Sequence, residues 1–256
     1  MNMNEDKYLL SSVYNTLSIL DLLSTNNEMG ITEISNSTGL SKSSVFRMMY
    51  TLEKKEFVYK TSTSKYRLGI KLAYYGSIVT ENLNVFNVIK PFLQSLRDVH
   101  NETTHLGILD EDLNVIFMAK EPSTATIQMT SKVGYKLPFY ISAMGKILAA
   151  NRMDHQLLEK LKNYNFVKYT SNTITEYEKI IEMLSKVRDQ NYSVDEEESE
   201  EGLTCIAVPV RDFTGNTVAA ISISGPTLRI KRNWEYLIND LKSTGDEASL
   251  IMGYRE

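Results

Sequence analysis

Residues 38–58 read TGLSKSSVFRMMYTLEKKEFV and predict the turn and the second helix of a helical pair. Gly39 stands where a tight turn between two helices needs a residue that tolerates a positive φ angle. Ser41 follows in the N-cap position, because its hydroxyl can accept a hydrogen bond from a backbone N–H of the first helical turn. The apolar residues after it have the spacing of one helical face. They are Val45, Met48, Met49 and Leu52.

The segment before this turn also predicts helices. Residues 12–25, SVYNTLSILDLLST, have apolar residues at helical spacing. The stripe consists of Val13, Leu17, Leu20 and Leu23. A second, short helix opens with Thr32 as its N-cap and Ile34 facing inward. A short helix, a Gly turn and another helix match a helix-turn-helix, whose second helix, about 10–12 Å across, can enter a major groove about 12 Å wide.

The N-terminal part of this second helix offers small hydroxyls and two cations. The candidate DNA-binding residues are Ser41, Lys42, Ser43, Ser44 and Arg47. Small hydroxyls permit close approach of the backbone to DNA, and an arginine can reach phosphate or guanine. Many helical hairpins have a similar pattern, so this pattern alone does not identify a DNA-binding helix. The segment that follows strengthens the prediction.

Residues 57–69, FVYKTSTSKYRLG, alternate apolar and polar side chains around a polar tip and predict a β-hairpin. A hairpin directly after a recognition helix is a wing, which can follow the adjacent DNA backbone or minor groove. Lys65 and Arg67 are its candidate DNA contacts. An ordinary surface hairpin would show the same alternation.

Charge is distributed unevenly along the chain. The 256 residues have a formal net charge of −4, yet residues 40–71 hold eight Lys and Arg against two Glu, a net charge of +6. A basic island in an acidic chain indicates a local contact with a polyanion. A solvated helix face is the alternative, and a steep dependence of binding on salt distinguishes the two.

Composition excludes several classes of protein. The length predicts about two domains. The sequence has no run of 18 apolar residues and no secretory signal. Cys205 is the one cysteine, so no internal disulfide can form. We therefore expect a cytoplasmic protein without a membrane partner. No catalytic or cofactor motif is present and the three histidines form no ligand pair, so we expect no enzyme, cofactor or metal.

The rest of the chain predicts a mixed α/β domain. Residues 71–84 read as a linker helix with a stripe through Tyr75, which either pairs with its copy in a dimer or is buried in a core. Strands and helices then alternate, and two adjacent antiparallel strands precede a final helix at about 231–252. Strands are expected at 104–110, 114–121, 126–133, 203–212 and 216–226, and helices at 141–151, 155–164 and 175–190.

These segments together resemble the IclR family of bacterial transcription regulators over nearly the full length. The specific matches are residues 38–58, YRLG at 66–69, LPFYISAMGKILAA at 137–150, and NYSVDEEESEEGLTCIAVPVRDFTGNTVAAISISGP at 191–226. The resemblance implies an α+β fold: a winged helix-turn-helix at 1–70, a linker helix at 71–84 and a GAF-like effector-binding domain at 85–256. It also implies dimers or tetramers on an operator in double-stranded DNA, controlled by a small molecule.

The resemblance carries over a set of effector-pocket positions. They are Ala143, Met144, Asp195, Leu203, Cys205, Ser222 and Ser224. Met144 is bulkier than the Gly or Ala often found there in relatives, which bears on the size of the pocket. Ala143 and Met144 are expected at a helix N-terminus, which favours a carboxylate. Ser222 and Ser224 are two residues apart on a strand, so their hydroxyls share one face. Asp195 can accept from a ligand hydroxyl or amide. The set fits a small hydroxy-, keto- or sugar acid.

Each of these features has a simpler alternative. The two serines can bond to backbone in a packed core, and Cys205 can be a core residue. The acidic run DEEESEE at 195–201 is expected to be a solvated loop. The alternative function is a small-molecule-sensing protein with an enzymatic role or with interactions that do not involve DNA.

Overall fold

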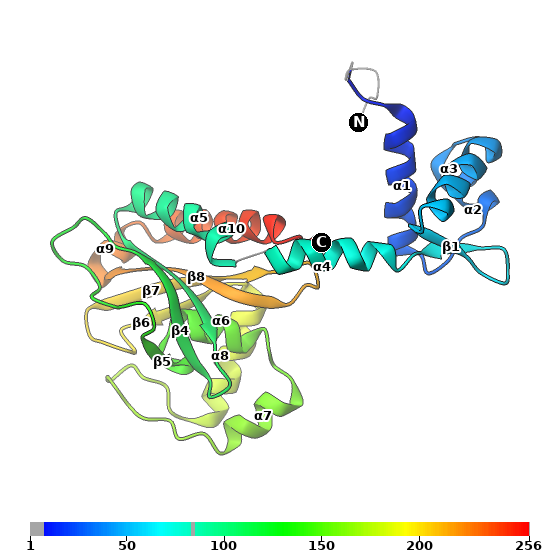
Figure 1. Cartoon of the computed structure of the whole chain (residues 1–256). Coiled ribbons are helices and arrows are strands. Elements are labelled where there is room, and N and C mark those ends of the chain that lie inside the picture. The colour runs from blue at the N-terminus through cyan, green and yellow to red at the C-terminus, as the bar shows by residue number, and fades with distance from the viewer. Residues whose placement is uncertain (1–7, 83–84, 256) are drawn as a thin grey trace. The chain divides into compact units, whose positions relative to one another are not determined.

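The chain folds as two compact units, residues 1–82 and residues 83–256 (Figure 1). The computed structural model describes residues 8–82 and 85–255, with the side chains of residues 77 and 79–82 outside that description. Each unit has its own hydrophobic core. Within the described ranges, no helix combines the length and apolar character that crossing a membrane requires.

The N-terminal unit is a helix-turn-helix followed by a hairpin and a further helix. Its elements are α1 (Ser11–Thr25), α2 (Ile31–Thr38), α3 (Lys42–Lys54), β1 (Val58–Lys60), β2 (Tyr66–Leu68) and α4 (Lys71–Asn82). The two strands are antiparallel, with Val58 opposite Leu68, and form the predicted wing. The core contains Ile19, Leu23, Ile34, Val45, Met49, Leu52, Val58 and Tyr66.

Local signals set the turn between α2 and α3. Gly39 has a φ of 71° and its N–H donates to the Ser35 carbonyl, so it ends α2 as predicted. The Ser41 hydroxyl accepts from the Ser44 N–H at 3.2 Å and caps α3, also as predicted. The predicted cap of α2 is wrong. The helix begins after Gly30, whose N–H donates to the Glu33 carboxylate at 2.7 Å.

The predicted apolar stripe of α1 is correct only in its second half. Leu23 is buried and Leu20 is partly buried, whereas Val13 and Leu17 are 51% and 55% exposed. The first two turns of α1 therefore extend past the core of the unit, and their apolar residues face outward. Helical periodicity identifies an apolar face but not how much of its length is covered.

The helix expected at 71–84 is described as α4 up to Asn82. The last two residues of that range, and the side chain of Val79, lie outside the described residues. Tyr75 is 5.7 Å from Phe57 between ring centroids, so the first half of α4 packs on the end of the wing. The outer part of Tyr75 is exposed.

The C-terminal unit is built on a six-stranded antiparallel sheet in the order β5-β4-β3-β8-β7-β6. Its strands are β3 (Thr103–Leu109), β4 (Asn114–Glu121), β5 (Lys136–Pro138), β6 (Ser193–Glu196), β7 (Leu203–Arg211) and β8 (Thr217–Pro226). The other elements are α5 (Val85–His100), the 3-10 helix η1 (Phe139–Ile141), α6 (Ala143–Ala150), α7 (His155–Lys162), α8 (Tyr177–Gln190), α9 (Thr227–Arg232) and α10 (Trp234–Ile251).

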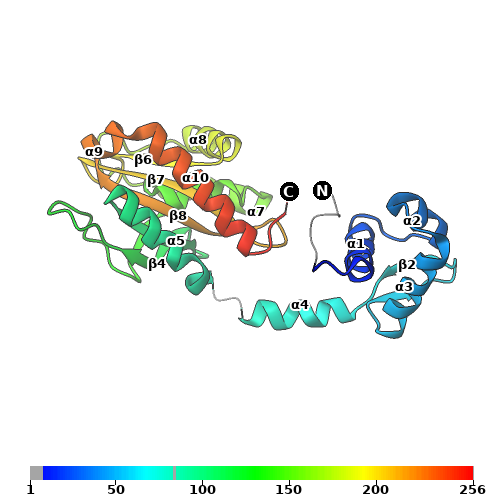
Figure 2. The ribbon, with the colours of Figure 1, turned by 90° about the horizontal axis from the view of Figure 1, so that it is seen from above.

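Helices cover both faces of this sheet. Figure 2 shows α5 and α10 together on one face, and α6 and α8 pack on the other. Successive side chains of a strand alternate between the faces, so Ile221 and Ile223 of β8 join the core under α5 and α10. Ala220 joins the other core, which places Ser222 and Ser224 on the α6 face.

Two predicted elements of this unit differ from the structure. Residues 126–133 form no strand, and the edge strand β5 comes later, at Lys136–Pro138. The Lys120 ammonium donates to the Met129 and Ser131 carbonyls at 2.7 and 2.8 Å, which occupies backbone acceptors that a sheet would pair. The final helix expected at about 231–252 is present as α10, but it begins only at Trp234, after the separate short helix α9 has ended at Arg232.

Candidate DNA-binding and effector-binding sites

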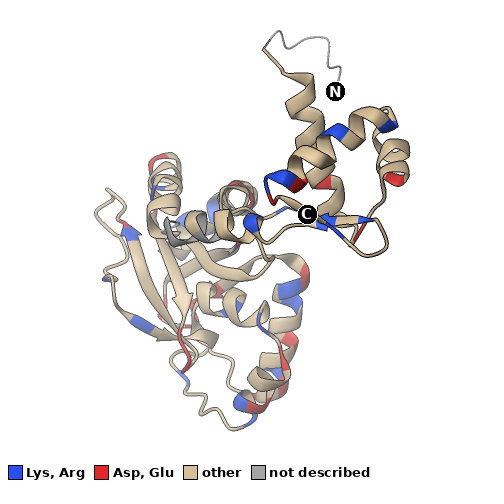
Figure 3. Cartoon of the chain, turned by 45° about the vertical axis from the view of Figure 1, so that its right-hand side comes forward, with Lys and Arg blue, Asp and Glu red and all other residues tan. Residues whose placement is uncertain are grey.

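The exposed face of α3 carries the predicted DNA-binding residues of the helix-turn-helix. Lys42, Ser43 and Arg47 are exposed, and Figure 3 shows the cations of α3 and the wing in blue. The Ser41 hydroxyl lies 3.0 Å from that of Ser43 and 2.9 Å from that of Ser44. The three hydroxyls thus form one polar cluster at the start of the helix, where the Ser41 oxygen is engaged by the cap.

The two predicted wing cations differ in their surroundings. The Arg67 guanidinium lies 4.2 Å from the centroid of the Tyr59 ring and is exposed, a cation–π arrangement that leaves its donors open to a phosphate. Lys65 is held by the Glu33 carboxylate at 3.2 Å. The hydrogen bond from the Gly30 N–H, and after it this contact with Lys65, lowers the pKa of Glu33. A DNA contact by Lys65, as predicted, would therefore compete with an ion pair.

Two aromatic residues on the same face of α3 were missed by the sequence analysis. Phe46 and Tyr50 are about half exposed, and their rings stack with centroids 6.4 Å apart. The Lys54 ammonium lies 5.4 Å from the centroid of the Tyr50 ring. Counting three and four residues from Ser43 and Arg47 would have placed both aromatic residues on the exposed face.

Six of the seven predicted effector residues line one cavity in the C-terminal unit. They are Ala143, Met144, Asp195, Cys205, Ser222 and Ser224. Phe117, Met129, Leu137, Ser142 and Ser199 complete the lining. Leu203 is not part of it and lines an open groove with residues 200–202 and 226, which shares Met129 with the cavity. The cavity volume is about 10 Å³, which is about the space that one water molecule needs.

Met144 is one reason for this small volume. The residue is buried, and Gly107 of β3 makes room for it, because a Cβ at Gly107 would lie 2.8 Å from the Met144 sulfur. Ser142 caps α6, with its hydroxyl accepting from the Gly145 N–H at 3.4 Å. Ala143 and Met144 are the first two residues of α6, so their N–H groups have no acceptor within the helix. No described residue accepts a hydrogen bond from them.

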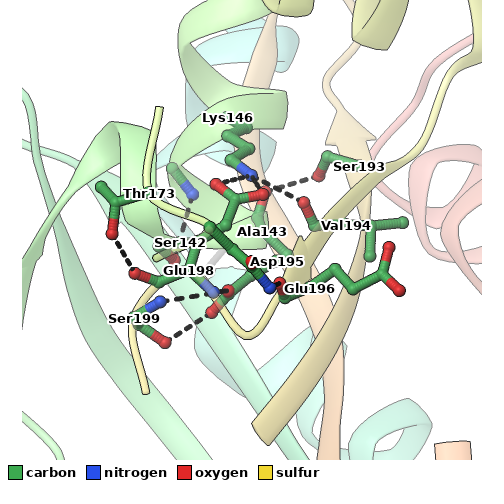
Figure 4. Close-up of polar contacts among 12 residues, drawn as sticks. Ser142, Ala143, Lys146, Thr173, Ser193, Val194, Asp195, Glu196, Glu198 and Ser199 are labelled. Carbon is green, nitrogen blue, oxygen red and sulfur yellow. Dashed lines mark hydrogen bonds and ion pairs between the residues drawn. The ribbon is translucent and has the colours of Figure 1, made fainter. Parts of the chain in front are cut away.

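The acidic run is only in part the solvated loop that was expected, because Glu196, Glu200 and Glu201 are exposed but two of its carboxylates are not. Asp195 and Glu198 are 2% and 8% exposed. The Lys146 ammonium of α6 contacts both Glu198 oxygens at 2.5 Å and the Val194 carbonyl at 2.8 Å (Figure 4). Burial raises the pKa of Glu198, and the Lys146 charge opposes that rise.

The Asp195 carboxylate also builds this turn. It accepts from the Glu198 N–H at 2.8 Å and from the Ser199 hydroxyl at 2.6 Å (Figure 4). Burial raises the pKa of Asp195, which the Lys146 charge and these hydrogen bonds oppose. A ligand group at Asp195 would therefore share a carboxylate that already has partners.

Cys205 and the two serines share one face of the sheet. Cys205 is opposite Ser224 and Ala207 is opposite Ser222 in the register of β7 and β8. Burial, with the negative charge of Asp195, raises the pKa of Cys205, so its thiol stays protonated and behaves as a core group.

His105 is a further buried polar residue beside the cavity. It is opposite Ser222 in the register of β3 and β8, so both side chains are on the same face. Its Nε2 lies 2.6 Å from the Ser131 hydroxyl, while its Nδ1 has no partner among the described residues. Burial, aided by the Lys120 charge, lowers the pKa of His105 to about 3. His105 is one of the three histidines, for which the sequence indicated only that they form no ligand pair. Its place as a polar residue in an otherwise apolar strand was the signal that could have identified it.

No group of three or more His, Cys, Asp and Glu side chains in the described ranges could hold a metal ion.

Two models of one protein family match the chain. The IclR helix-turn-helix domain matches residues 12–62, and the C-terminal region of the bacterial transcriptional regulator IclR matches residues 77–250. The chain belongs to the IclR family. These matches cover the helix-turn-helix, the second half of α4 and nearly all of the sheet and helices of the C-terminal unit.

Similar proteins of the IclR family have a comparable length. The HTH-type transcriptional regulator KdgR of Escherichia coli is 37% identical over 250 residues, covering 96% of this chain and 94% of KdgR. The regulator XynR of Escherichia coli is 35% identical, covering 96% of this chain and 98% of XynR. The crystal structure of Thermotoga maritima IclR matches with a TM-score of 0.63 and 31% identity, covering 95% of this chain and 99% of that one.

This IclR-family chain is therefore a transcriptional regulator with a helix-turn-helix DNA-binding domain and a C-terminal effector-binding domain. The relatives named above are transcriptional regulators, in agreement with the expectation that the chain is not an enzyme.

Proposed function

We propose that the chain binds its operator through α3 and the wing, and that a small organic acid at the N-terminus of α6 controls this binding. The cavity beside Ala143 and Met144 carries the second half of the proposal, because it joins donor N–H groups at a helix N-terminus to two strand hydroxyls.

On the DNA side, Arg47 and Lys42 hold phosphate or read guanine, and Ser43 and Ser44 approach the bases. Arg67 holds the backbone from the wing, and Lys65 does so when it leaves Glu33. A dimer places two such helices in successive major grooves, about 34 Å apart. A dimer or a tetramer of the chain therefore binds a two-part operator.

On the effector side, the carboxylate of the acid binds at the N–H groups of Ala143 and Met144. A hydroxyl or keto group of the acid binds Ser222 and Ser224, and the Asp195 carboxylate accepts from a hydroxyl. A volume of about 10 Å³ cannot hold such an acid, so Met144 and Met129 must move when it enters. With this movement, the conformation of the chain with the acid bound differs from the one without it. An effector can control DNA binding only if two such states exist.

The DNA half is tested by measuring binding of the purified chain to the DNA upstream of its own gene, at two salt concentrations and with excess competitor DNA. Sequence-selective affinity that falls steeply with salt supports phosphate contacts by α3 and the wing. Affinity that is equal for all sequences contradicts an operator-specific role for α3.

The effector half is tested by calorimetry with hydroxy-, keto- and sugar acids, each paired with its neutral amide. We expect heat from an acid and none from its amide, because only the acid has a carboxylate for the α6 N-terminus. Met144→Ala should widen the range to larger acids and lower stability by about 2–5 kcal/mol. Binding of a neutral aromatic ligand with no acid binding would exclude the proposed ligand class.

A further inference from the structure

Phe46 has no role in the DNA contacts proposed above, although it lies among them. Its side chain is 54% exposed on α3, and Tyr50, one turn later, is 52% exposed. Single exposed apolar residues are common on proteins. Here two aromatic rings stack on one another on the face that the basic residues share, and this arrangement points to a contact surface.

Helix geometry places Phe46 with the residues that face DNA. Ser43, Phe46 and Arg47 are three and four residues apart, so they lie on one face, opposite the buried Val45 and Met49. Phe46 is the fifth residue of α3. Side chains in the first part of a recognition helix are those that reach base edges in the major groove.

The chemistry of a phenyl ring limits what it can recognise there. Phe46 has no hydrogen-bonding group, so it cannot read the donors and acceptors of the base edges or hold a phosphate. The C5-methyl group of thymine is the apolar group on the major-groove edges of the four bases. Contact between the ring and this methyl removes apolar surface of both from water.

The neighbours of Phe46 hold it ready for this contact. The Tyr50 ring lies on one side of it, and the Lys54 ammonium lies over the Tyr50 ring at 5.4 Å from the centroid. A side chain that is already restricted loses less conformational entropy on binding. Lys54, at the end of this row, can reach a phosphate while the Tyr50 ring supports Phe46.

We propose that Phe46 packs against the C5-methyl group of a thymine in each operator half-site and so selects thymine at that position. The inference rests on the proposed role of α3 in DNA binding. It adds a base-specific apolar contact beside Arg47, which supplies the polar one.

The experiment replaces thymine by deoxyuridine, which lacks only the methyl group. A binding sequence is first selected from random duplexes with the full chain, and each thymine of a half-site is then replaced in turn. We expect one replacement to weaken binding of the unaltered chain about fourfold per half-site, the change expected for one methyl group. The same replacement should leave the affinity of Phe46→Ala unchanged.

Two further variants keep the result interpretable. Phe46→Leu preserves an apolar side chain and should retain part of the sensitivity to deoxyuridine. Phe213→Ala removes another exposed phenyl ring, in the turn between β7 and β8, and should retain all of it. Thermal melting of each variant shows whether the fold is intact.

Two outcomes overturn the inference. In the first, no replacement of a thymine by deoxyuridine weakens binding of the unaltered chain. In the second, the replacement weakens binding of Phe46→Ala as much as it weakens binding of the unaltered chain. Arg47→Ala separates these from a failure of the proposed DNA-binding face. If Arg47→Ala weakens binding while Phe46→Ala does not alter the thymine preference, only the role of Phe46 is wrong. If neither variant changes binding, α3 is not the DNA-binding helix.

Discussion

At the scale of single residues, Arg47 gives the most direct test of the DNA-binding face. Its side chain is exposed on α3 and no described partner competes for it. We expect Arg47→Ala to weaken operator binding by about 1–3 kcal/mol if the guanidinium reads a base. If it holds a phosphate, all sequences should weaken alike and the slope of log affinity against log salt should fall by about one.

The matched control for Arg47→Ala is Arg188→Ala, which removes an exposed arginine from α8 in the other unit. Fluorescence anisotropy with operator and non-operator duplexes measures both variants. Equal operator affinity for Arg47→Ala and the unaltered chain would count against α3 as the recognition helix.

His105 predicts a specific dependence of stability on pH. Its pKa in the folded chain, about 3, is below its usual value of 6.5, so between these values the unfolded chain binds the additional proton. The contribution of neutral His105 to stability is therefore present above about pH 6.5 and is lost as pH falls towards 3. Relative to His105→Asn, the unaltered chain should lose about 1.4 kcal/mol per pH unit in this window.

Denaturant unfolding of both proteins from pH 7 to pH 4 measures this difference. The comparison is needed because Asp195 and Glu198 have raised pKa values, and a raised carboxyl pKa makes stability fall as pH rises. His155→Asn, at an exposed histidine, is the control for the substitution itself. A constant gap between the unaltered chain and His105→Asn would mean that His105 titrates normally.

At the scale of the elements, two glycines predict opposite effects of the same substitution. In the described part of the chain, no atom lies within 4 Å of a Cβ added at Gly39 or at Gly76. Gly39 ends α2 with a φ of 71°, which costs a residue with a Cβ about 1–2 kcal/mol. Gly76 lies inside α4, where alanine is favoured over glycine by about 0.8–1.0 kcal/mol.

Gly39→Ala should therefore lower the free energy of unfolding of the N-terminal unit, and Gly76→Ala should raise it. Because Gly39 sets the angle between α2 and α3, its substitution should also weaken operator binding. Urea unfolding and anisotropy check the two effects. A destabilising Gly76→Ala together with a neutral Gly39→Ala would contradict the conformational explanation.

At the scale of the whole molecule, the two proposed sites must be coupled for an effector to control DNA binding. Ser222 and Ser224 line the effector cavity in the C-terminal unit, whereas α3 belongs to the other unit. Replacing both serines by alanine should leave operator affinity unchanged without effector and reduce the shift that the effector produces. Operator binding titrated with and without the acid found by calorimetry measures that shift.

The control for the double serine variant is Thr217→Ala, at the other end of the same strand. It should keep the full response to the effector. If the double variant loses operator affinity without effector to the same degree as it loses the response, the two hydroxyls are structural and not ligands.

The sequence by itself determined the features that depend on neighbours within a few residues. The Ser41 cap and the left-handed Gly39 follow from the bonding of one turn, and the wing follows from alternation over thirteen residues. The pairing of β7 with β8 was also predictable, since a short turn joins two strongly apolar runs.

Only the tertiary structure decided which of these residues are covered and by what. Residues 126–133 have a strand-like pattern, but Lys120 holds their carbonyls outside the sheet. Glu198 is buried in an acidic run because Lys146, from a distant helix, contacts it. Met144 is buried beside the proposed effector cavity because Gly107 makes room for it. Desolvation, pairing and close packing act between segments far apart in the chain, and a local pattern does not specify them.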